Sequence, residues 1–565
     1  TPTPTPVPVD ITPPVISAIS AAGITQTDAT ITWTTNEGSD SQVVFPTGPC
    51  PGVTNCSSPL VSGFRNSHSI NLGNSLLANT TYTYQARSRD ASGNLTISAN
   101  QTFRTSVLAP TPSATPAPGS RTLYDNSSIG NDSVSYADNS ASTPWRTIGR
   151  AAWGSTSRSA PNSSEAAKAG DVVLVSGGSY DSTEAVNNRF GVVYNPVNSG
   201  SSGNYITFTC VGDCTLSAPN ANGPVIGSSG RSYIKWYADV SQGNSWIINA
   251  CGMQSGCPNG TVNTTPDTGP VVCHDGTGCH IEGAVIDGTT PVDYIDNYNG
   301  IRVEVAPFTI LRNNTIRNFR TQSGSRNATG ITLYSSANTI VENNQISNAA
   351  GGVYMKHNPG SSLSMTNVRI RYNNISNTGN CVSWSLGTGS NHFYQNICTD
   401  STFGAFITGN GLLNDWIFNN TFSNLSGSGV YLSSNGTGGR AWNNICANCA
   451  AGIMSETGPM PTETVIDFEH NNYYNYSNFY VGVDGNRTFS SFKATFPTHE
   501  QSAPASIDAD PMFLSSTNFR LQPSSPARTI GVDILDLDGD GSTTDIIPAG
   551  AYITGDEVIG VNTGG

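Results

Sequence analysis

Short Asn-bearing segments recur at a regular interval through the second half of this 565-residue chain. They are RNNTI (312–316), ENNQI (342–346), YNNI (372–375), YQNI (394–397), FNNTF (418–422), WNNI (442–445) and HNNYY (470–474). Their last apolar residues lie at 316, 346, 375, 397, 422, 445 and 473, so consecutive segments are 22 to 30 residues apart. This interval fits one turn of a solenoid and is too short for a propeller blade, which needs about 40–45 residues. The repeat therefore predicts a solenoid whose asparagines can hydrogen-bond from turn to turn.

A second marker has the same phase as the first. Strands are predicted to begin at Gly300, Gly330, Gly352, Gly404, Gly429 and Gly452, and Cys381 fills the same place in a further repeat. Alternation along each strand sends every second side chain inward. The predicted core positions are Ile301, Val303, Ile331, Leu333, Val353, Met355, Val382, Trp384, Ala405, Ile407, Val430 and Leu432. The residues between them are predicted to point outward.

The composition is typical of an all-β protein and excludes several functions. Only 11% of the residues are charged, and the formal net charge is −14. Such a chain, with no basic stripe, is not expected to bind nucleic acid. No apolar run reaches 18 residues, so the sequence predicts no membrane span.

The twelve cysteines form six pairs that are close in sequence. The pairs are Cys50 with Cys56, Cys210 with Cys214, Cys251 with Cys257, Cys273 with Cys279, Cys381 with Cys398, and Cys446 with Cys449. An even number with local pairing indicates disulfides formed in an oxidising compartment, so we expect an extracellular protein, either secreted or on the cell surface. Zinc binding is the alternative, but only Cys446 and Cys449 have the C-x2-C spacing that it favours.

Two linkers rich in Thr and Pro divide the chain. The predicted organisation is a linker at 1–13, a domain of short alternating strands at 14–106, a second linker at 107–120, the solenoid at 121–555 and a tail at 556–565. In the first domain, Leu76-x-Ala78-x-Thr80-x-Tyr82, the position of Trp33 and the turn Asp90-x-x-Gly93-Asn94 resemble the fibronectin type III family. The resemblance implies a β-sandwich with a tyrosine corner at Tyr82, acting as a spacer without catalytic residues.

The solenoid is similar to the right-handed parallel β-helices of the pectate-lyase-like superfamily. The similarity lies in SVSYADNSASTPWRTIGRAA (133–152), AGDVVLVSGGSY (169–180), DPMFLSSTNFRLQPSSPARTIG (510–531) and PAGAY (548–552). These segments resemble the first and last turns of bacterial extracellular members. The superfamily includes lyases, hydrolases, epimerases and adhesins, so the resemblance implies an architecture and leaves the chemistry open.

Two outward columns along the solenoid are candidates for contact with sugars. One contains Arg302, Thr332, Tyr354, Ser383, Phe406 and Tyr431, and the other contains Glu304, Tyr334, Lys356, Ser385, Thr408 and Ser433. Turns stack about 4.8 Å apart, so each column forms a ladder along the axis. Aromatic side chains at this interval, here Tyr354, Phe406 and Tyr431 with Glu304 beside them, suit the binding of a polysaccharide. The alternative is that these rings only cover strand edges or a loop.

The resemblance also implies a candidate catalytic group. Lyases of the superfamily remove the proton next to a uronate carboxylate, using a Lys or Arg base and cations or Ca2+ to neutralise the carboxylate. Lys356 could be the base, Arg302, Arg369 or Arg371 could bind the carboxylate, and His357 or Tyr334 could be the acid. The acidic Ca2+ cluster of such lyases is missing, because only Glu304 lies in the column, with Glu342 on another strand. A solvated surface lysine is the alternative reading of Lys356.

Two further acidic patterns suggest other sites. Glycoside hydrolysis needs two carboxylates; Glu456 is isolated, but Asp467 and Glu469 alternate on one strand beside His470. The segment from Asp536 through Asp538 and Asp540 matches the first half of a Ca2+ loop. Ile547 occupies the place of the usual Glu, and Asp545 could substitute for it. Bound Ca2+ is therefore the one expected cofactor, and a plain acidic loop is the alternative.

The sequence leaves two functions open. One is a structural protein of the cell surface or of a filament, with glycan contacts and with copies joined head to tail through the 1–13 segment. The other is a secreted polysaccharide lyase or a related carbohydrate-active enzyme. Sequons at Asn79, Asn94, Asn126, Asn327 and Asn435 permit glycosylation in either case.

Overall fold

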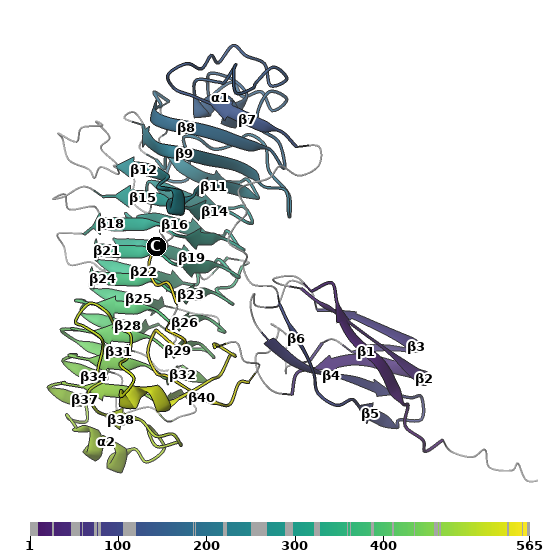
Figure 1. Cartoon of the computed structure of the whole chain (residues 1–565), viewed down its shortest axis with the longest axis vertical. Helices are drawn as coiled ribbons and strands as arrows, with labels where there is room; N and C mark the ends of the chain where they lie inside the picture. Colours follow the sequence, from purple (N-terminus) through teal and green to yellow (C-terminus); the bar gives the residue numbers. More distant parts are fainter. Residues whose placement is uncertain are drawn as a thin grey trace, which may run out of the picture. The chain divides into compact units, whose positions relative to one another are not determined.

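The structure is a computed structural model of the whole chain (Figure 1). It describes residues 10–24, 28–46, 57–58, 60–72, 76, 81–105, 120–184, 186, 188–218, 223–249, 268–288, 298–320, 328–358, 360–361, 363–385, 389–409, 412–433, 436–456, 462, 465–538, 542–555 and 557–561. The chain divides into two compact units. One comprises Thr1–Ser113 with Val532–Ile547, and the other comprises Ala114–Gly531 with Pro548–Gly565.

The N-terminal unit contains antiparallel strands around its own core. They are β1 (Ile16–Ala22), β2 (Thr30–Val44), β3 (Val61–Asn71), β4 (Thr81–Arg89), β5 (Leu95–Ile97) and β6 (Gln101–Arg104). The long strand β2 pairs with β1 and β3, and its C-terminal end also pairs with β4. Strand β4 pairs in turn with β5 and β6, so β2 joins a sheet of β1, β2 and β3 to a sheet of β4, β5 and β6. Trp33, Tyr82, Tyr84 and Phe103 fill the space between the sheets. The predicted β-sandwich is confirmed, and its membership of the fibronectin type III family stays a prediction.

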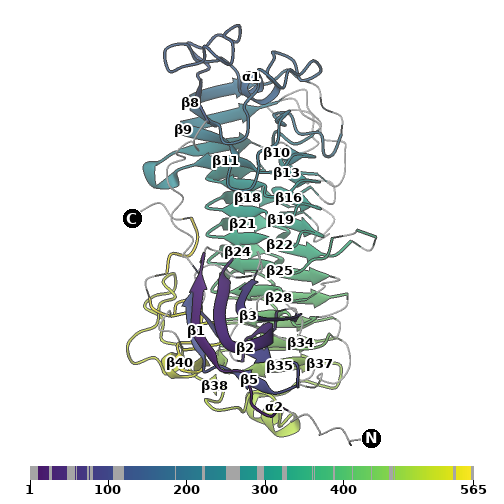
Figure 2. The same ribbon diagram turned by 90° about the vertical axis from the view of Figure 1, so that its right-hand side faces the viewer.

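The second unit is the predicted right-handed parallel β-helix, in which three strands form most turns (Figures 1 and 2). The first sheet contains β10 (Ile226–Ser229), β13 (Val271–His274), β16 (Ile301–Glu304), β19 (Thr329–Tyr334), β22 (Gly351–Lys356), β25 (Asn380–Ser385), β28 (Phe403–Thr408), β31 (Ser428–Leu432), β34 (Ala451–Ser455) and β37 (Asn478–Gly482). The second contains β11 (Ile234–Ala238), β14 (His280–Glu282), β17 (Ile310–Arg312), β20 (Ile340–Glu342), β23 (Arg369–Arg371), β26 (His392–Tyr394), β29 (Trp416–Phe418), β32 (Gly439–Trp442) and β35 (Ile466–Glu469). The third contains β12 (Ser245–Asn249), β15 (Ala284–Asp287), β18 (Thr315–Phe319), β21 (Gln345–Ala349), β24 (Asn374–Thr378), β27 (Ile397–Thr399), β30 (Thr421–Ser423), β33 (Ile445–Ala447), β36 (Asn472–Tyr474) and β38 (Ile507–Asp508).

Short helices lie at the two ends of the β-helix (Figure 1). At the N-terminal end, β7 (Thr122–Asp125), β8 (Val172–Asp181) and β9 (Ile206–Ser217) precede the regular turns, and the fully buried helix α1 (Ile148–Trp153) packs there. At the other end, helix α2 (Phe489–Thr495) places Phe492 against Phe479 of the last first-sheet strand, with ring centroids 4.9 Å apart. The remaining elements are the 3-10 helices η2 (Val240–Gln242) and η3 (Pro526–Thr529) and the paired strands β39 (Gly531–Val532) and β40 (Ile546–Ile547).

The interior follows the predicted alternation. Every core position predicted for the first sheet, from Ile301 to Leu432, is at most 5% exposed. The apolar side chains of consecutive turns therefore stack into one continuous core along the β-helix.

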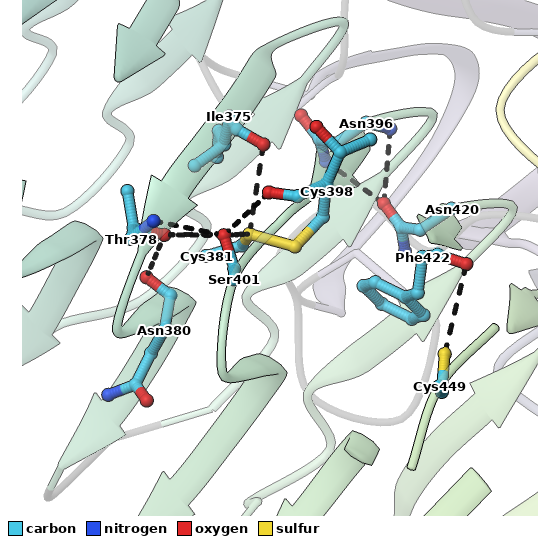
Figure 3. Close-up of a disulfide and its surroundings, with 11 residues drawn as sticks. Ile375, Thr378, Asn380, Cys381, Asn396, Cys398, Ser401, Asn420, Phe422 and Cys449 are labelled. Atoms are coloured by element: carbon cyan, nitrogen blue, oxygen red, sulfur yellow. Dashed lines mark hydrogen bonds between the residues drawn. A yellow bond between two sulfur atoms is a disulfide. The ribbon is translucent and has the colours of Figure 1, made fainter. Parts of the chain in front are cut away.

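Four of the six predicted disulfides lie within this core. They are Cys210–Cys214, Cys273–Cys279, Cys381–Cys398 and Cys446–Cys449. Cys381 on β25 and Cys398 on β27 join the first and third sheets, as Figure 3 shows. These bonds favour the disulfide interpretation over zinc.

The other two predicted disulfides are not tested by the structure. The predicted bond between Cys50 and Cys56 lies outside the described residues, because both cysteines fall in segments that the structure does not describe. The same holds for the predicted bond between Cys251 and Cys257. The pairing of Cys56 with Cys50, and of Cys257 with Cys251, therefore stays a prediction from their spacing.

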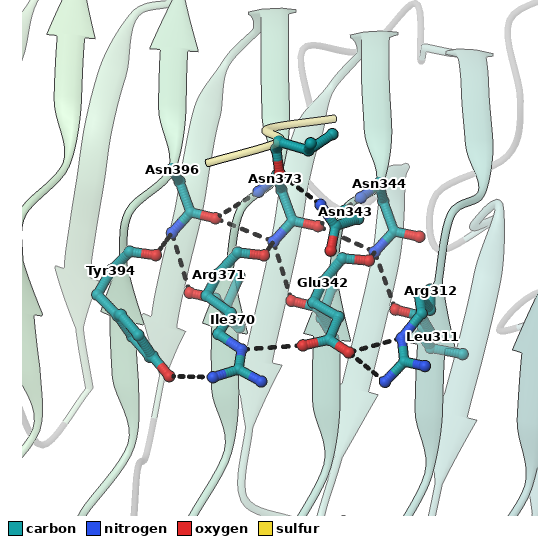
Figure 4. A network of polar contacts seen from close by, with 12 residues as sticks. Leu311, Arg312, Glu342, Asn343, Asn344, Ile370, Arg371, Asn373, Tyr394 and Asn396 are labelled. Carbon is teal, nitrogen blue, oxygen red and sulfur yellow. Dashed lines mark hydrogen bonds and ion pairs between the residues drawn. The ribbon is translucent and has the colours of Figure 1, made fainter. Parts of the chain in front are cut away.

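The repeated asparagines form a ladder at the turn between the second and third sheets (Figure 4). Asn344 Nδ2 donates to Asn373 Oδ1 at 2.9 Å, and Asn373 Nδ2 donates to Asn396 Oδ1 at the same distance. The ladder runs through Asn314, Asn344, Asn373, Asn396, Asn420, Asn444 and Asn471. The residue before each has a left-handed backbone, with a φ of 54° at Asn343. Asn tolerates that conformation well, which explains why the pair Asn-Asn recurs.

The C-terminal segment covers much of the outward face of the third sheet. Ile445 and Ala447 of β33 pack against Leu521, Ala527 and Ala549. The chain then runs back along the asparagine turns, where Gly550 N donates to Asn443 O and Gly560 N donates to Tyr372 O. The first and second sheets are therefore the faces left for a functional site. Among the described residues, we find no helix that is both long and apolar enough to cross a membrane.

Candidate functional site

The strand register of the first sheet brings the predicted outward columns together. Arg302 pairs with Thr332, Thr332 with Tyr354, and the column continues through Ser383, Phe406 and Tyr431. The second column pairs Glu304 with Tyr334, Tyr334 with Lys356, and then continues through Ser385 and Thr408. Both ladders therefore exist on one face of the β-helix, which Figure 2 shows as the column of labels from β10 to β37.

Strand alternation directs all of these side chains outward, but other parts of the protein bury some of them. Arg302, Glu304 and Tyr431 are only 4%, 7% and 6% exposed. At the N-terminal end of the face, Arg189 lies 3.7 Å from Glu304, and the neighbouring Phe190 stacks on His274. At the other end, Tyr431 stacks on Phe406 with ring centroids 4.7 Å apart. The accessible part of the face is the half-buried strip between these ends, formed by Tyr334, Tyr354, Lys356, Ser385, Phe406 and Thr408.

The candidate lyase residues are only partly brought together. Lys356 lies one turn from Tyr334, and its ammonium has no hydrogen bond or ion pair with any described residue. Arg302 is engaged, because its Nε and Nη2 donate to Glu304 Oε2 at 3.0 and 2.8 Å. His357 Nδ1 lies 3.3 Å from the Ser335 hydroxyl.

The two other arginines proposed as carboxylate ligands lie on the second sheet, away from the column of Lys356. Arg371 binds Glu342, and Arg369 donates to the Val368 and Ser390 carbonyls. They are therefore not positioned beside the candidate base.

The outward face of the second sheet is richer in charge, and sequence reasoning named some of its residues without placing them on one face. One column contains Lys235, His280, Ile310, Ile340, Arg369, His392, Trp416, Arg440 and Asp467. The other contains Tyr237, Glu282, Arg312, Glu342, Arg371, Tyr394, Phe418, Trp442 and Glu469. Most strands of this sheet are three residues long, too short for alternation to be read from sequence. In the sequence, these strands could be located only by their position just before the repeated asparagines.

Charges of opposite sign pair along this face from turn to turn (Figure 4). Glu342 accepts from Arg312 on one side and from Arg371 on the other, and Arg371 Nη1 donates to Tyr394 Oη at 3.1 Å. Burial raises the pKa of Glu342, but the two guanidiniums outweigh burial and hold that pKa below its ordinary value. The carboxylate is therefore ionised at neutral pH and compensated by protein charges.

A second charged group lies at the N-terminal end of this face. His280 Nε2 is 2.9 Å and Lys235 Nζ is 3.6 Å from Glu282 Oε2. Burial lowers the pKa of Lys235 to about 8 and, with the Lys235 charge, that of His280 to about 4. All three side chains are buried, so they are placed to stabilise the sheet and not to meet a polymer.

The C-terminal end of the same face combines aromatic rings with one arginine. The Arg440 guanidinium lies 4.7 Å from the ring centre of Trp416 and 4.6 Å from that of Trp442. Trp442 Nε1 donates to Asp467 Oδ2 at 3.0 Å. Glu469 accepts from the Ser502 amide and hydroxyl, and burial raises the pKa of both carboxyls. Asp467 and Glu469 each have protein donors, while Glu456, the isolated candidate, is exposed on the first-sheet side after β34.

The acidic loop near the C-terminus gathers three carboxylates. Oxygens of Asp533, Asp536 and Asp538 lie within 4.8 Å of one another, close enough to share one cation. Burial, followed by the charges of Asp538 and Asp545, raises the pKa of Asp533 to about 7. Asp540 lies outside the described residues, and Asp545 is not part of the cluster. Sequence reasoning missed Asp533 because it precedes the loop motif.

Comparison with known proteins supports the fold. A family model described as a right handed beta helix region matches residues 261–414, which is less than half of the chain. A search of the curated proteins finds no match. Among solved structures, pectate lyase Pel9A is 12% identical with a TM-score of 0.38, over 77% of this chain and 96% of that one.

Two further solved structures give similar values. XylC in complex with xylose is 11% identical with a TM-score of 0.35, over 64% of this chain and 86% of that one. The Family 28 exopolygalacturonase of Yersinia enterocolitica is 11% identical with a TM-score of 0.33, over 84% and 100%. Scores this low carry no argument. The family model and the strand topology define a right-handed parallel β-helix protein.

Proposed function

We propose that this chain is an extracellular structural protein that binds polysaccharide along the first sheet of its β-helix. The observation that carries the proposal is the half-buried strip from Tyr334 to Thr408, defined above. Four consecutive strands contribute to it, which corresponds to about 14 Å along the axis. An extended sugar chain can follow such a straight strip, with its C–H faces on aromatic rings and its hydroxyls on polar side chains.

The contacts at the centre of the strip support this proposal. Tyr334 and Tyr354 meet edge to face with ring centroids 6.0 Å apart, which holds both rings in place. Phe406 stacks on Tyr431 of one neighbouring strand, and its register partner on the other neighbouring strand is the small Ser383. Lys356 has no protein partner among the described residues and supplies a hydrogen-bond donor and a positive charge.

The same geometry favours binding over β-elimination. A lyase needs a base together with cations that neutralise the uronate carboxylate. Lys356 could serve as the base, but Glu304 already engages Arg302. Elimination remains the second candidate function. The observation that favours it is the ammonium of Lys356, which has no partner in the part of the chain that the structure describes.

Binding to a panel of neutral and acidic polysaccharides tests the proposal. We expect Tyr354→Ala and Lys356→Ala to weaken retention of the bound polysaccharide at least about tenfold. Tyr474→Ala, on the third sheet, is the matched control and should leave retention unchanged. Retention that is equal in all three variants would exclude the first-sheet face. Formation of unsaturated uronide by the wild type, lost in Lys356→Ala, would instead establish elimination.

We also propose that the loop carrying Asp533, Asp536 and Asp538 binds a structural Ca2+. Three carboxylates within 4.8 Å repel one another, and a hard cation with oxygen ligands relieves that repulsion. The motif around Asp536 and Asp538 is consistent with such a loop. Assembly through the 1–13 segment stays a prediction, because residues 1–9 lie outside those that the structure describes.

A further inference from the structure

Arg440 differs from the other arginines on the second-sheet face. Arg312 and Arg371 bind Glu342 one turn away, and Arg369 donates to two backbone carbonyls. Arg440 is half-buried, yet its guanidinium has no hydrogen-bond acceptor and no ion pair among the residues that the structure describes. Its guanidinium contacts the rings of Trp416 and Trp442, and the charge of Asp467 acts on it from a longer range.

A carboxylate lies one turn from Arg440 without a hydrogen bond or close ion pair to its guanidinium, although its charge acts on the guanidinium. Asp467 is the register partner of Arg440 on β35. Its Oδ2 accepts the indole N–H of Trp442, and its buried Oδ1 has no hydrogen-bond partner. Burial raises the pKa of Asp467, although the hydrogen bond from Trp442 and the charge of Arg440 oppose that rise. The two tryptophan rings therefore orient the Arg440 guanidinium, and its N–H groups have no acceptor among the described residues.

The surrounding rings restrict what can bind there. Trp416 has His392 stacked on it at 4.8 Å and Arg440 on the next strand, so neighbours occupy both of its faces. Trp442 meets Arg440 and, edge to face, His470. The Trp416 ring, with a neighbour on each face, is therefore not available for stacking on a sugar. The planar edge of a guanidinium matches the two oxygens of a carboxylate or a sulfate.

We propose that Arg440 is the centre of an oxyanion-binding site on the second sheet, which takes the carboxylate or sulfate group of an acidic glycan. Trp416 and Trp442 are positioning residues that fix the guanidinium by cation–π contacts. The site is separate from the first-sheet strip and does not depend on the function proposed for that strip.

Calorimetry on the full chain with two probes, inorganic sulfate and a galacturonate trimer, tests the site. We expect Arg440→Gln to lower the affinity for the bound probe at least about tenfold. Arg440→Lys should lower it less, because Lys retains the charge but not the planar fork. Since Arg440 has no protein acceptor to lose among the described residues, both variants should unfold at nearly the wild-type temperature. Arg317→Gln is the matched control, because its guanidinium is already bound to Asp287.

The outcomes separate the possible sources of the anion. Binding of both probes indicates that the site recognises oxyanions in general. Binding of the trimer alone indicates that the ligand is the carboxylate of a sugar. Either result supports the proposal if Arg440→Gln lowers the affinity for the bound probe at least about tenfold while Tyr354→Ala leaves it unchanged. Equal affinity of wild type and Arg440→Gln, no binding of either probe, or equal binding of the methyl-esterified trimer would overturn the proposal. If Arg440→Gln fails to fold, Arg440→Lys decides the same question.

Discussion

Arg371 Nε donates to Glu342 Oε2 at 2.9 Å, joining two residues that are 29 positions apart in sequence and one turn apart in the β-helix. Arg312 binds the same carboxylate from the opposite side. The β-helix thus uses charge, as well as its apolar interior, to hold consecutive turns in register. This relationship leads to the first prediction.

Glu342→Ala should lower the free energy of unfolding by about 3–5 kcal/mol, because two guanidiniums on this face lose their carboxylate. Glu342→Gln should cost less, since an amide oxygen can still accept. Because the pKa of Glu342 is lowered in the folded state, its contribution is present above about pH 4.5 and is lost as the pH falls. Urea unfolding at neutral pH and at about pH 3 measures both effects. An Ala variant as stable as the wild type would contradict this account.

Asn373→Leu should destabilise the β-helix by at least about 3 kcal/mol, because several buried groups lose a partner at about 1–3 kcal/mol each. The Asn373 side chain bonds to Asn344, Asn396 and the carbonyls of Val341 and Arg371. Asn374→Ala, at the next position and outside the ladder, is the control and should cost under about 1 kcal/mol. Equal losses in the two variants, measured by thermal unfolding, would show that the ladder contributes little.

The N-terminal unit should lose stability in acid through His68. Its ring is buried, stacks on Trp33 at 4.9 Å and contacts the hydroxyls of Thr35 and Ser41. Burial, followed by the charge of Arg65, lowers the pKa of His68, so folding disfavours the protonated ring. Stability is then present above about pH 6.5 and declines as the pH falls below that value.

His68→Gln should flatten this pH dependence, since the substituted side chain does not titrate. Calorimetric scans of the full chain between about pH 5 and pH 7.5 can follow the transition of the N-terminal unit. A transition with the same pH dependence in wild type and His68→Gln would assign the effect to another group.

Calcium should raise the unfolding temperature of the wild type, and a chelator should reverse the rise. Binding to the folded state alone stabilises by about 2.7 kcal/mol at a hundredfold excess over Kd. Asp538→Asn should reduce the response, while Asp510→Asn, an exposed acid outside the cluster, should retain it. A wild-type chain whose melting is indifferent to Ca2+ would exclude the site.

The sequence by itself determined the core of this protein. Strands such as that of Val353 and Met355 are long enough for alternation to assign an inward and an outward face, because successive side chains point to opposite sides. The Asn of each turn was equally readable, since Asn suits both the left-handed backbone and a ladder of stacked amides. These are local properties, and a repeat displays them several times.

Only the tertiary structure decided which outward residues meet and which are covered. Glu342 binds Arg371, and Asp467 accepts the indole N–H of Trp442, because the register brings together residues that are a whole turn apart in sequence. Likewise, Arg189 reaches Glu304 from a segment more than a hundred residues earlier. Among the described residues the Arg440 donors have no acceptor because neighbouring side chains satisfy one another. Packing between turns settles this, and no short stretch of sequence contains that information.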